Sequence, residues 1–561
     1  MTASLLTTPL ELLEHIVLLA TGGTTRGPPS VLQALRLSCR TMHQALSVER
    51  NPHLYLMLYL DKFDISSPYR HLPSERLSAP HLEQELKNRY AALQCIRRKE
   101  FHHPHLAGAL ATIYAMSLED DGRNNEQIIW ADLPQFVQEF LHKHLSNGVT
   151  VNYGWPLENE VNTLAVILFW FITSDSRLHE ETTQLRQEFM DILSHYAYAG
   201  FRYPCFTEPE YMFYPCHEAM SSVSLHGTYP PARPNMITMQ YFGQETTLTL
   251  PPVAPFAILS QFVRAEQRPL AAPPELPANR QEALMRGIMR GPTREDIEHF
   301  NTKCKTRLVG ASRGNCADPS PKSQSHDSDW YRCLLGAYRM PPCTTMGFYA
   351  PGILSGRWQG SSITPFPDVY KSILSSSDAP SVFPASGRFP LYVRFREYYC
   401  YTPSLPVPVM DDTDAFFNAF LPRGCRWYKT EDGIEIVGEN QSFKTYYTEL
   451  QPNNESEQAG TVTRDLDYSN VRDVIVVGET EEPYATAWNG YKYIGRIRPS
   501  DGLVVLLREP MNQMHPLGCA LLRGYIFSSC NFVGRWRSIS NGEQPAEWES
   551  IFSMSKVVTT A

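Results

Sequence analysis

The sequence predicts an α+β multidomain protein, in which an N-terminal three-helix unit and a helical scaffold precede a C-terminal antiparallel β-barrel-like domain. Three observations predict this class. The chain has 561 residues, too many for one hydrophobic core at roughly 150 residues per domain. Apolar residues recur at helical spacing up to about Gly200. After Asp329, short strand-like segments rich in tyrosine and tryptophan alternate with turn residues.

The N-terminal 64 residues contain three amphipathic segments. Pro9 suits the first position of a helix, and Gly22 and Gly23 are suited to end it. The apolar positions of the first two segments fall three or four residues apart: Leu12, Leu13, Ile16, Val17 and Leu19, then Leu32, Leu35, Cys39, Met42 and Leu46. A third apolar run spans 54–60. Three short helices cannot bury all of these side chains themselves, so we expect a partner to cover some of them.

These residues resemble the F-box. The resemblance rests on Pro-x-Glu-Leu-Leu-x-x-Ile at 9–16 and on Leu-x-x-Leu followed by Ser-Cys-Arg within 32–40. It implies docking on the adaptor subunit of a cullin-type ubiquitin ligase, through Pro9, Leu12, Leu13, Ile16, Leu32, Leu35, Leu37, Cys39 and Arg40. The alternative is an N-terminal three-helix cap that packs only on its own chain.

The middle of the chain is predicted to be helical and then irregular. Residues 65–200 carry helical periodicity around 82–96, 106–114, 133–141, 159–171 and 180–198, and form the expected scaffold. The apolar run 164–172 is about half the length needed to cross a bilayer, which favours a buried helix. Residues 201–309 are proline-rich, so we expect short strands and loops there, with a hairpin around Gly243 and two short helices at 279–289 and 293–303. Residues 310–328 have almost no apolar side chains, which is typical of a flexible linker.

The last segment, 329–561, is predicted to contain only strands. The candidates are 354–363, 391–401, 426–436, 442–449, 473–478, 491–498, 503–508, 521–528, 531–538 and 549–554. Ten strands without helices between them favour a barrel or a sandwich. Gly356 and Trp358 begin the first strand and are repeated as Gly534 and Trp536 in the last strand but one. Two copies near the ends of one sheet favour a closed barrel, in which the first and last strands meet at a seam. The segments 354–360, 487–507 and 522–537 resemble the C-terminal domain of fungal F-box proteins and, more distantly, barrel-bearing substrate receptors.

Signatures of catalysis and of metal binding are scarce in the sequence. It has no Gly-x-x-x-x-Gly-Lys and no His-Glu-x-x-His, so we predict no catalytic residues and no cofactor. His102, His103 and His105 are the densest potential metal ligands. Pro104 interrupts their spacing and no cysteine is near enough to complete a familiar set, so we expect a solvated loop and no metal site.

The candidate substrate-binding residues form one aromatic and basic group: Trp488, Tyr491, Tyr493, Arg496 and Arg498. Arginine beside aromatic rings at a barrel mouth is suited to hold a carboxylate, an amide or a phosphorylated peptide through forked hydrogen bonds. On a strand, Tyr491 and Tyr493 share one face and Arg496 and Arg498 share the other. The alternative is that the tyrosines line the core while the arginines extend into solvent.

Composition and charge narrow the possible functions. The net charge of −9 disfavours nucleic acid as a partner. With scattered cysteines and no export signal, we expect a soluble protein of the cytoplasm, the nucleus or both, without membrane contact. The sequence therefore predicts a non-catalytic receptor subunit of a ubiquitin ligase, with an adaptor, a cullin scaffold and an unknown protein substrate as partners. The alternatives are a small-ligand-binding β-barrel unrelated to ubiquitin and a hydrolase or isomerase in the barrel.

Overall fold

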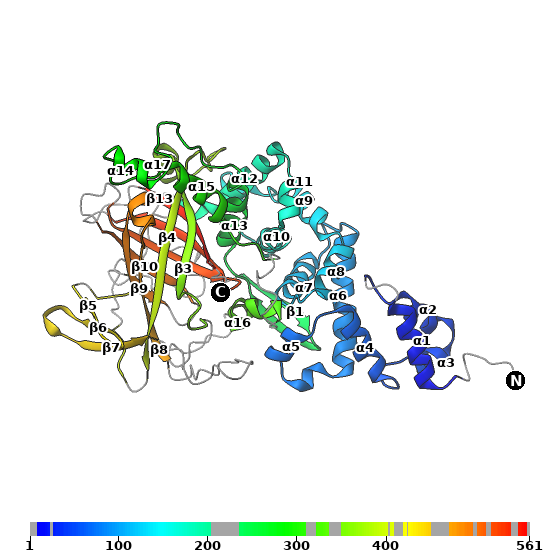
Figure 1. Ribbon diagram of the computed structural model, residues 1–561. Helices are drawn as coiled ribbons and strands as arrows, with labels where there is room; N and C mark the ends of the chain where they lie inside the picture. The colour runs from blue at the N-terminus through cyan, green and yellow to red at the C-terminus, as the bar shows by residue number, and fades with distance from the viewer. Residues whose placement is uncertain are drawn as a thin grey trace.

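The computed structural model describes residues 8–22, 26–202, 235–309, 321–335, 349–401, 404–408, 419–422, 424–449, 471–497, 502–511, 518–539 and 548–557. Figure 1 shows the N-terminal helices at one end of the molecule, the helical scaffold in the middle and a barrel of strands at the other end. The predicted combination of helices with a C-terminal β-barrel is confirmed. No helix of the described ranges is both long and apolar enough to cross a membrane.

Four helices, where we predicted three, make up the N-terminal unit. They are α1 (Leu10–Gly22), α2 (Ser30–Ser38), α3 (Arg40–Ala45) and α4 (Pro52–Lys62). The segment predicted as one helix breaks at Cys39, whose backbone is extended at φ −162° and ψ 164°. The Cys39 thiol caps the next helix by accepting a hydrogen bond from the backbone N–H of Met42, with 3.5 Å between the atoms.

The scaffold follows the predicted helical periodicity. Its elements are α5 (Ser66–His71), η2 (Ser74–Leu77), α6 (Ala79–Arg97), α7 (Leu106–Leu118), α8 (Arg123–Trp130), α9 (Leu133–Lys143), η3 (Val149–Asn152), α10 (Glu160–Phe171), α11 (Asp175–Glu180), α12 (Thr183–Ala197) and η4 (Ala199–Arg202). Helix α10 carries the long apolar run, and its residues 162–170 are all buried. The interpretation of that run as a buried helix is confirmed.

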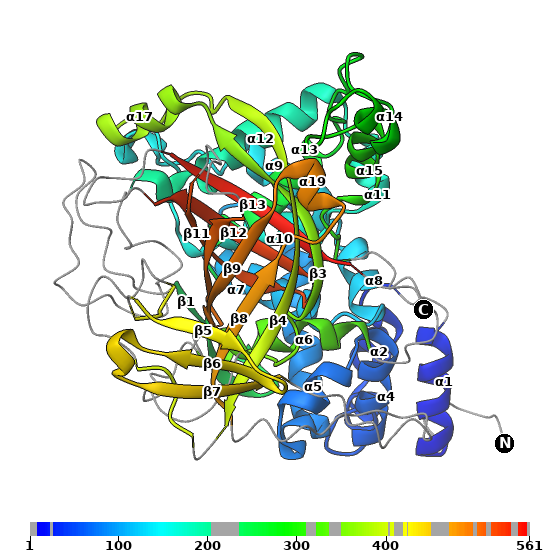
Figure 2. The ribbon, with the colours of Figure 1, turned by 60° about the vertical axis from the view of Figure 1, so that its left-hand side comes forward.

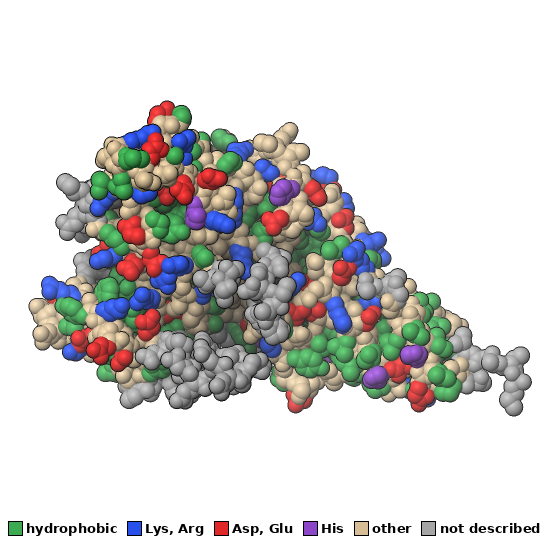
Figure 3. Space-filling model, viewed as in Figure 1, with side chains coloured by type: hydrophobic (Ala, Val, Ile, Leu, Met, Phe, Trp, Pro, Cys, Tyr) green, Lys and Arg blue, Asp and Glu red, His purple; other side chains and the backbone are tan. Residues whose placement is uncertain are grey.

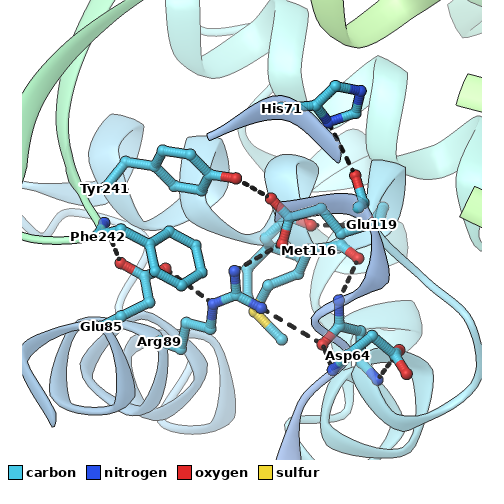
Figure 4. A network of polar contacts seen from close by, with 12 residues as sticks. Asp64, His71, Glu85, Arg89, Met116, Glu119, Tyr241 and Phe242 are labelled. Atoms are coloured by element: carbon cyan, nitrogen blue, oxygen red, sulfur yellow. Dashed lines mark hydrogen bonds and ion pairs between the residues drawn. The ribbon is translucent and has the colours of Figure 1, made fainter. Parts of the chain in front are cut away.

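A β-hairpin is fixed on the scaffold by a buried polar network. Strands β1 (Met236–Tyr241) and β2 (Gln244–Thr249) pair antiparallel, which confirms the predicted hairpin at Gly243. Figure 4 shows Arg89 of α6 between two carboxylates, with its Nε 2.8 Å from Glu85 and its Nη2 2.6 Å from Glu119. The hydroxyl of Tyr241 donates to Glu119 at 2.5 Å. One guanidinium therefore holds α6, the end of α7 and the hairpin together.

The region between hairpin and barrel differs from the prediction. It holds α13 (Val253–Ala265), α14 (Arg280–Met285), α15 (Arg294–Lys303), η7 (Lys322–His326) and α16 (Asp327–Leu335). Helix α13 was not predicted, because it is buried on all sides from 253 to 264 and has no polar stripe to reveal it. The predicted linker is wrong for 321–328, where η7 and the start of α16 lie and Ser323 and His326 are buried. Residues 310–320 of that linker lie outside the described ranges.

The C-terminal sheet closes into an eight-stranded antiparallel barrel with the order β3-β13-β12-β11-β10-β9-β8-β4 and a final β3–β4 pairing. The barrel strands are β3 (Gly356–Pro365), β4 (Ala385–Tyr401), β8 (Val471–Glu479), β9 (Tyr491–Ile497), β10 (Val504–Pro510), β11 (Ala520–Phe527), β12 (Asn531–Ser538) and β13 (Glu549–Lys556). A side sheet of β5 (Arg426–Lys429), β6 (Gly433–Val437) and β7 (Lys444–Glu449), with η8 (Glu439–Gln441), extends from β4.

The ends of the barrel sheet meet as predicted, but the segment does not consist of strands alone. The first and last strands do pair, and Trp358 of β3 lies opposite Lys556 of β13 at the seam. Trp536 lies on β12, the last strand but one, as predicted, so the second glycine-tryptophan pair is one strand away from the seam. Helices also interrupt the predicted all-strand segment: α16 at its start, α17 (Pro367–Ser375) and α19 (Tyr484–Trp488).

The outer face of the barrel and the scaffold share one hydrophobic core. The barrel interior has its own apolar cluster, which includes Trp358, Tyr493 and Phe532. Outward-facing residues such as Val505 and Phe527 belong instead to the scaffold cluster. In Figure 2, α10, α12 and α13 lie behind β12 and β13, and α13 packs directly on both of these strands. Helix α13 is therefore the layer that joins the two halves.

Candidate interaction surfaces

One face of α1 presents apolar side chains to solvent. Leu12, Ile16 and Leu19 are 56%, 41% and 67% exposed, and their spacing of four and three residues places them on one side of the helix. We refer to these three residues as the α1 face. Figure 3 shows hydrophobic side chains gathered at the lower right, over the N-terminal helices. The inner side of α1 is buried through Leu13 and Val17, so the helix has a core of its own and still leaves apolar surface uncovered.

The predicted adaptor-binding residues divide into exposed and buried sets. Pro9, Leu12, Ile16, Leu37, Cys39 and Arg40 are exposed, and Leu35 is half-buried. Leu13 and Leu32 are only 2% and 5% exposed and pack in the small core of this unit. These two residues therefore belong to the packing of the unit, whereas the other predicted residues offer surface to a partner.

The α1–α2 connection fixes the N-terminal unit on the scaffold. The backbone N–H of Gly27 donates to Gln127 at 2.7 Å, and the hydroxyl of Tyr90 donates to the carbonyl of Gly27 at 2.7 Å. Gly27 has φ +85°, and a β-carbon there would lie 2.7 Å from the indole nitrogen of Trp130. The connection thus needs a glycine, both for its backbone conformation and for the close approach to the indole.

The structure does not bring the predicted substrate-binding residues together at the surface. Arg496 is buried, with its Nε 2.8 Å from Asp473 and its Nη2 3.0 Å from the carbonyl of Val407. Burial works to lower the pKa of Arg496, but the charge of Asp473 and the hydrogen bond to it outweigh burial and raise the pKa. Arg496 therefore attaches β9 to the neighbouring loops and is not available to a substrate.

The three aromatic residues of the predicted substrate-binding group lie in two different places. Tyr491 and Tyr493 are buried in the barrel interior, as the alternative interpretation predicts. Trp488 ends α19 and is half-buried, with its ring 6.2 Å from that of Phe300. Arg498 lies outside the described residues.

Sequence reasoning missed an apolar surface beside α19. Leu284, Met285, Ile288 and Met289 are all exposed, in and just after α14; we refer to them as the α14 patch. Three exposed arginines accompany it: Arg286, Arg290 and Arg294. The backbone N–H of Gly291 donates to the carbonyl of Thr486 in α19 at 3.0 Å and joins the patch to the barrel end. The signal in the sequence was a short run of apolar residues and arginines without core periodicity.

Comparison with known proteins identifies no relative. No protein-family model, no curated protein and no solved structure matches this chain. The functional argument therefore rests on the residues and geometry above.

Proposed function

We propose that the protein is the substrate-receptor subunit of a cullin-type ubiquitin ligase. The observation that carries this proposal is the α1 face, an uncovered apolar strip at the end of the molecule opposite the barrel. Leu12 and Ile16 belong to the motif that resembles the F-box, Leu19 follows three residues later, and the helix is otherwise packed through Leu13 and Val17. The partner that we propose for the α1 face is the adaptor that binds F-boxes, which links the receptor to the cullin scaffold.

The size of the exposed strip suits a protein interface. Full burial of a leucine or isoleucine side chain contributes about 1.5–3 kcal/mol, and roughly half of each side chain of the α1 face is open. Replacing two of them by aspartate removes that contribution and places charges in an apolar interface. We expect a loss of roughly 2–4 kcal/mol in adaptor binding, or about 30- to 1,000-fold in affinity.

Target capture is assigned to the barrel end, at the α14 patch. Apolar side chains with arginines around them favour a target segment that combines apolar with acidic residues. A receptor of this kind contributes no catalytic group. It holds the target beside a charged conjugating enzyme and so raises the effective concentration of the target lysine.

The experiment is co-purification of the adaptor and cullin with full-length variants. Leu12→Asp combined with Ile16→Asp should abolish co-purification, while Val151→Asp, at an exposed valine of η3 in the scaffold, should leave it intact. Circular dichroism must show that both variants stay folded; Leu13→Asp is unsuitable because Leu13 is a core residue. Adaptor binding that survives the double substitution would refute the proposal.

A specific observation favours a second function, binding of a small anionic ligand inside the barrel. The buried guanidinium of Arg508 lies 4.4 Å from the ring centre of Tyr491 and 4.3 Å from that of Trp536. Its Nε and Nη2 have no hydrogen-bond partner in the structure as described, and such buried donors are costly unless something accepts from them. Stabilisation of the wild type, but not of Arg508→Met, by a panel of small carboxylates in thermal unfolding would support this function. An equal response of both proteins would exclude it.

A further inference from the structure

The end of α6 brings three metal-ligand side chains together. Cys95 lies in the last turn of α6, after which Lys99 takes a left-handed backbone conformation with φ 55°. The backbone N–H of Glu100 donates to the carbonyl of Cys95 at 3.2 Å, and that of Lys99 donates to the carbonyl of Ile96 at 2.9 Å. This pair of bonds is the Schellman arrangement, which folds the chain back over the helix end. A further bond from the N–H of His103 to the carbonyl of Glu100, at 3.1 Å, places His103 in the same turn.

The ligand atoms of these residues already lie close to one another. One sulfur, oxygen or nitrogen atom from each of Cys95, Glu100 and His103 lies within 4.8 Å of the other two. The Nε2 of His103 is 3.9 Å from a carboxylate oxygen of Glu100. A tetrahedral zinc ion with bonds of about 2.0–2.3 Å requires ligand separations of roughly 3.3–3.7 Å. The Glu100 and His103 side chains are 34% and 40% exposed, so both have room to rotate by the needed ångström.

We infer that Cys95, Glu100 and His103 form a binding site for one zinc ion. Sulfur, imidazole nitrogen and carboxylate oxygen together suit zinc, whereas magnesium and calcium prefer oxygen ligands alone. Three protein ligands leave the fourth tetrahedral position to water. This inference is independent of the proposed ligase function.

Charge and proton balance are consistent with a zinc ion at this place. On binding, the Cys95 thiol releases its proton to solvent, and the thiolate and the Glu100 carboxylate neutralise the two positive charges of the ion. His103 binds through Nε2, so its Nδ1 carries the proton and no longer accepts the 3.2 Å hydrogen bond from the backbone N–H of His105. The positive charge that would repel the zinc ion is that of Arg98, whose Nη1 lies 3.7 Å from a carboxylate oxygen of Glu100. The Arg98 side chain is exposed enough to turn away.

We expected no cysteine near enough to these histidines to complete a familiar set, but the structure places Cys95 beside His103. In the sequence Cys95 and His103 are eight residues apart, on what reads as a helix followed by a loop. The turn at Lys99 reverses the chain, so that the two side chains lie close together in space. His102 differs from His103 because its ring lies against His144, with 5.2 Å between the ring centres.

The test is metal binding by the full-length protein after removal of metal. Zinc is titrated in competition with a chromogenic chelator, and cobalt is added separately as a spectroscopic probe. We expect one equivalent of zinc and a near-ultraviolet band of thiolate-to-cobalt charge transfer. Cys95→Ser should abolish the band and weaken zinc binding more than about 100-fold, beyond the loss typical of an outer-shell partner. His103→Ala should also weaken zinc binding, while the matched control His102→Ala should not.

Circular dichroism of each variant without metal separates lost binding from lost folding, and Cys95→Ala replaces Cys95→Ser if the serine variant unfolds. The inference is supported if the wild type binds one equivalent of zinc and shows the cobalt charge-transfer band, and the cysteine variant does not show the band. Failure of the wild type to bind zinc, a band that survives the Cys95 substitution, or equal losses in His102→Ala and His103→Ala would overturn it.

Discussion

We expect the stability of the junction between scaffold and barrel to depend on pH through Glu266. It caps the C-terminal end of α13 and is buried. Its carboxyl accepts hydrogen bonds from the backbone N–H of Thr306, at 2.9 Å, and from the Thr306 hydroxyl, at 2.7 Å. That hydroxyl lies 3.1 Å from the hydroxyl of Ser553 on β13. Burial raises the pKa of Glu266 from 4.5 to about 7, although the Thr306 hydrogen bonds and the charges of Arg388 and Lys305 oppose the rise.

The sign of the effect follows from the raised pKa. The folded protein holds a proton on Glu266 more tightly than the unfolded chain does, so this carboxyl contributes stability that is fully present below about pH 4.5. That contribution is lost as the pH rises through about 7. The rise of the Glu266 pKa from 4.5 to about 7 corresponds to roughly 3 kcal/mol in the free energy of unfolding, since one pKa unit is about 1.4 kcal/mol.

The substitution that tests this is Glu266→Gln, because the amide resembles the protonated acid, stays neutral and keeps an oxygen that accepts from Thr306. Denaturant unfolding of both proteins is measured from pH 5 to pH 8. We expect similar stability near pH 5 and a variant that is more stable by up to about 3 kcal/mol near pH 8. Glu275→Gln, at an exposed position of the same region, should follow the wild type throughout. A constant difference between wild type and Glu266→Gln across the pH range would refute the reasoning.

Two further predictions concern the scaffold and the barrel. Arg89→Met leaves Glu119 and its neighbouring carboxylate buried without their cation, and should cost about 3–5 kcal/mol in denaturant unfolding. Arg98→Met, at the exposed C-cap of the same helix, should change stability by less than about 0.5 kcal/mol, and equal losses would contradict the role of the network. Trp358→Ala empties a fully buried site in the barrel interior and should cost about 3–5 kcal/mol, with loss of near-ultraviolet circular dichroism. The half-exposed Trp427 is the control; if Trp427→Ala proves equally costly, burial is not the cause.

The sequence predicted elements well where local pattern and tertiary environment agree. Strand β9 was predicted because its side chains alternate, and its interior face holds Tyr491 and Tyr493 as expected. The hairpin at Gly243 was predicted from a turn residue between two short apolar runs, and Phe242 and Gly243 both take positive φ values there. Closure of the barrel was also predicted. Trp358 lies at the seam of β3 and β13, whereas Trp536 lies one strand away and does not face Trp358 across the seam.

Predictions failed where contacts distant in sequence decide the outcome. Helix α13 packs against the scaffold on one side and the barrel on the other, so no polar face marks it in the sequence. Arg496 looked like a ligand-binding residue, but its partner Asp473 lies on another strand and only the fold brings the two together. The closeness of Cys95 and His103 depends on one left-handed residue, Lys99, which no periodicity reveals.

For the proposed receptor, the rigid connection between its two ends is as important as either surface. A target lysine is modified efficiently only if it is held at a defined distance from the conjugating enzyme, and a loose tether lowers its effective concentration. Here the α1 face is held on α4 by the buried Lys62, whose ammonium donates to the carbonyl of Thr21 at 3.1 Å, and the unit is fixed to the scaffold through Gly27. The scaffold is in turn joined to the barrel by the buried helix α13. Because every joint in this series is buried, packing sets the separation of the α1 face from the α14 patch. For the proposed receptor, we therefore expect a substitution that loosens one joint to lower ubiquitin transfer even when both surfaces still bind.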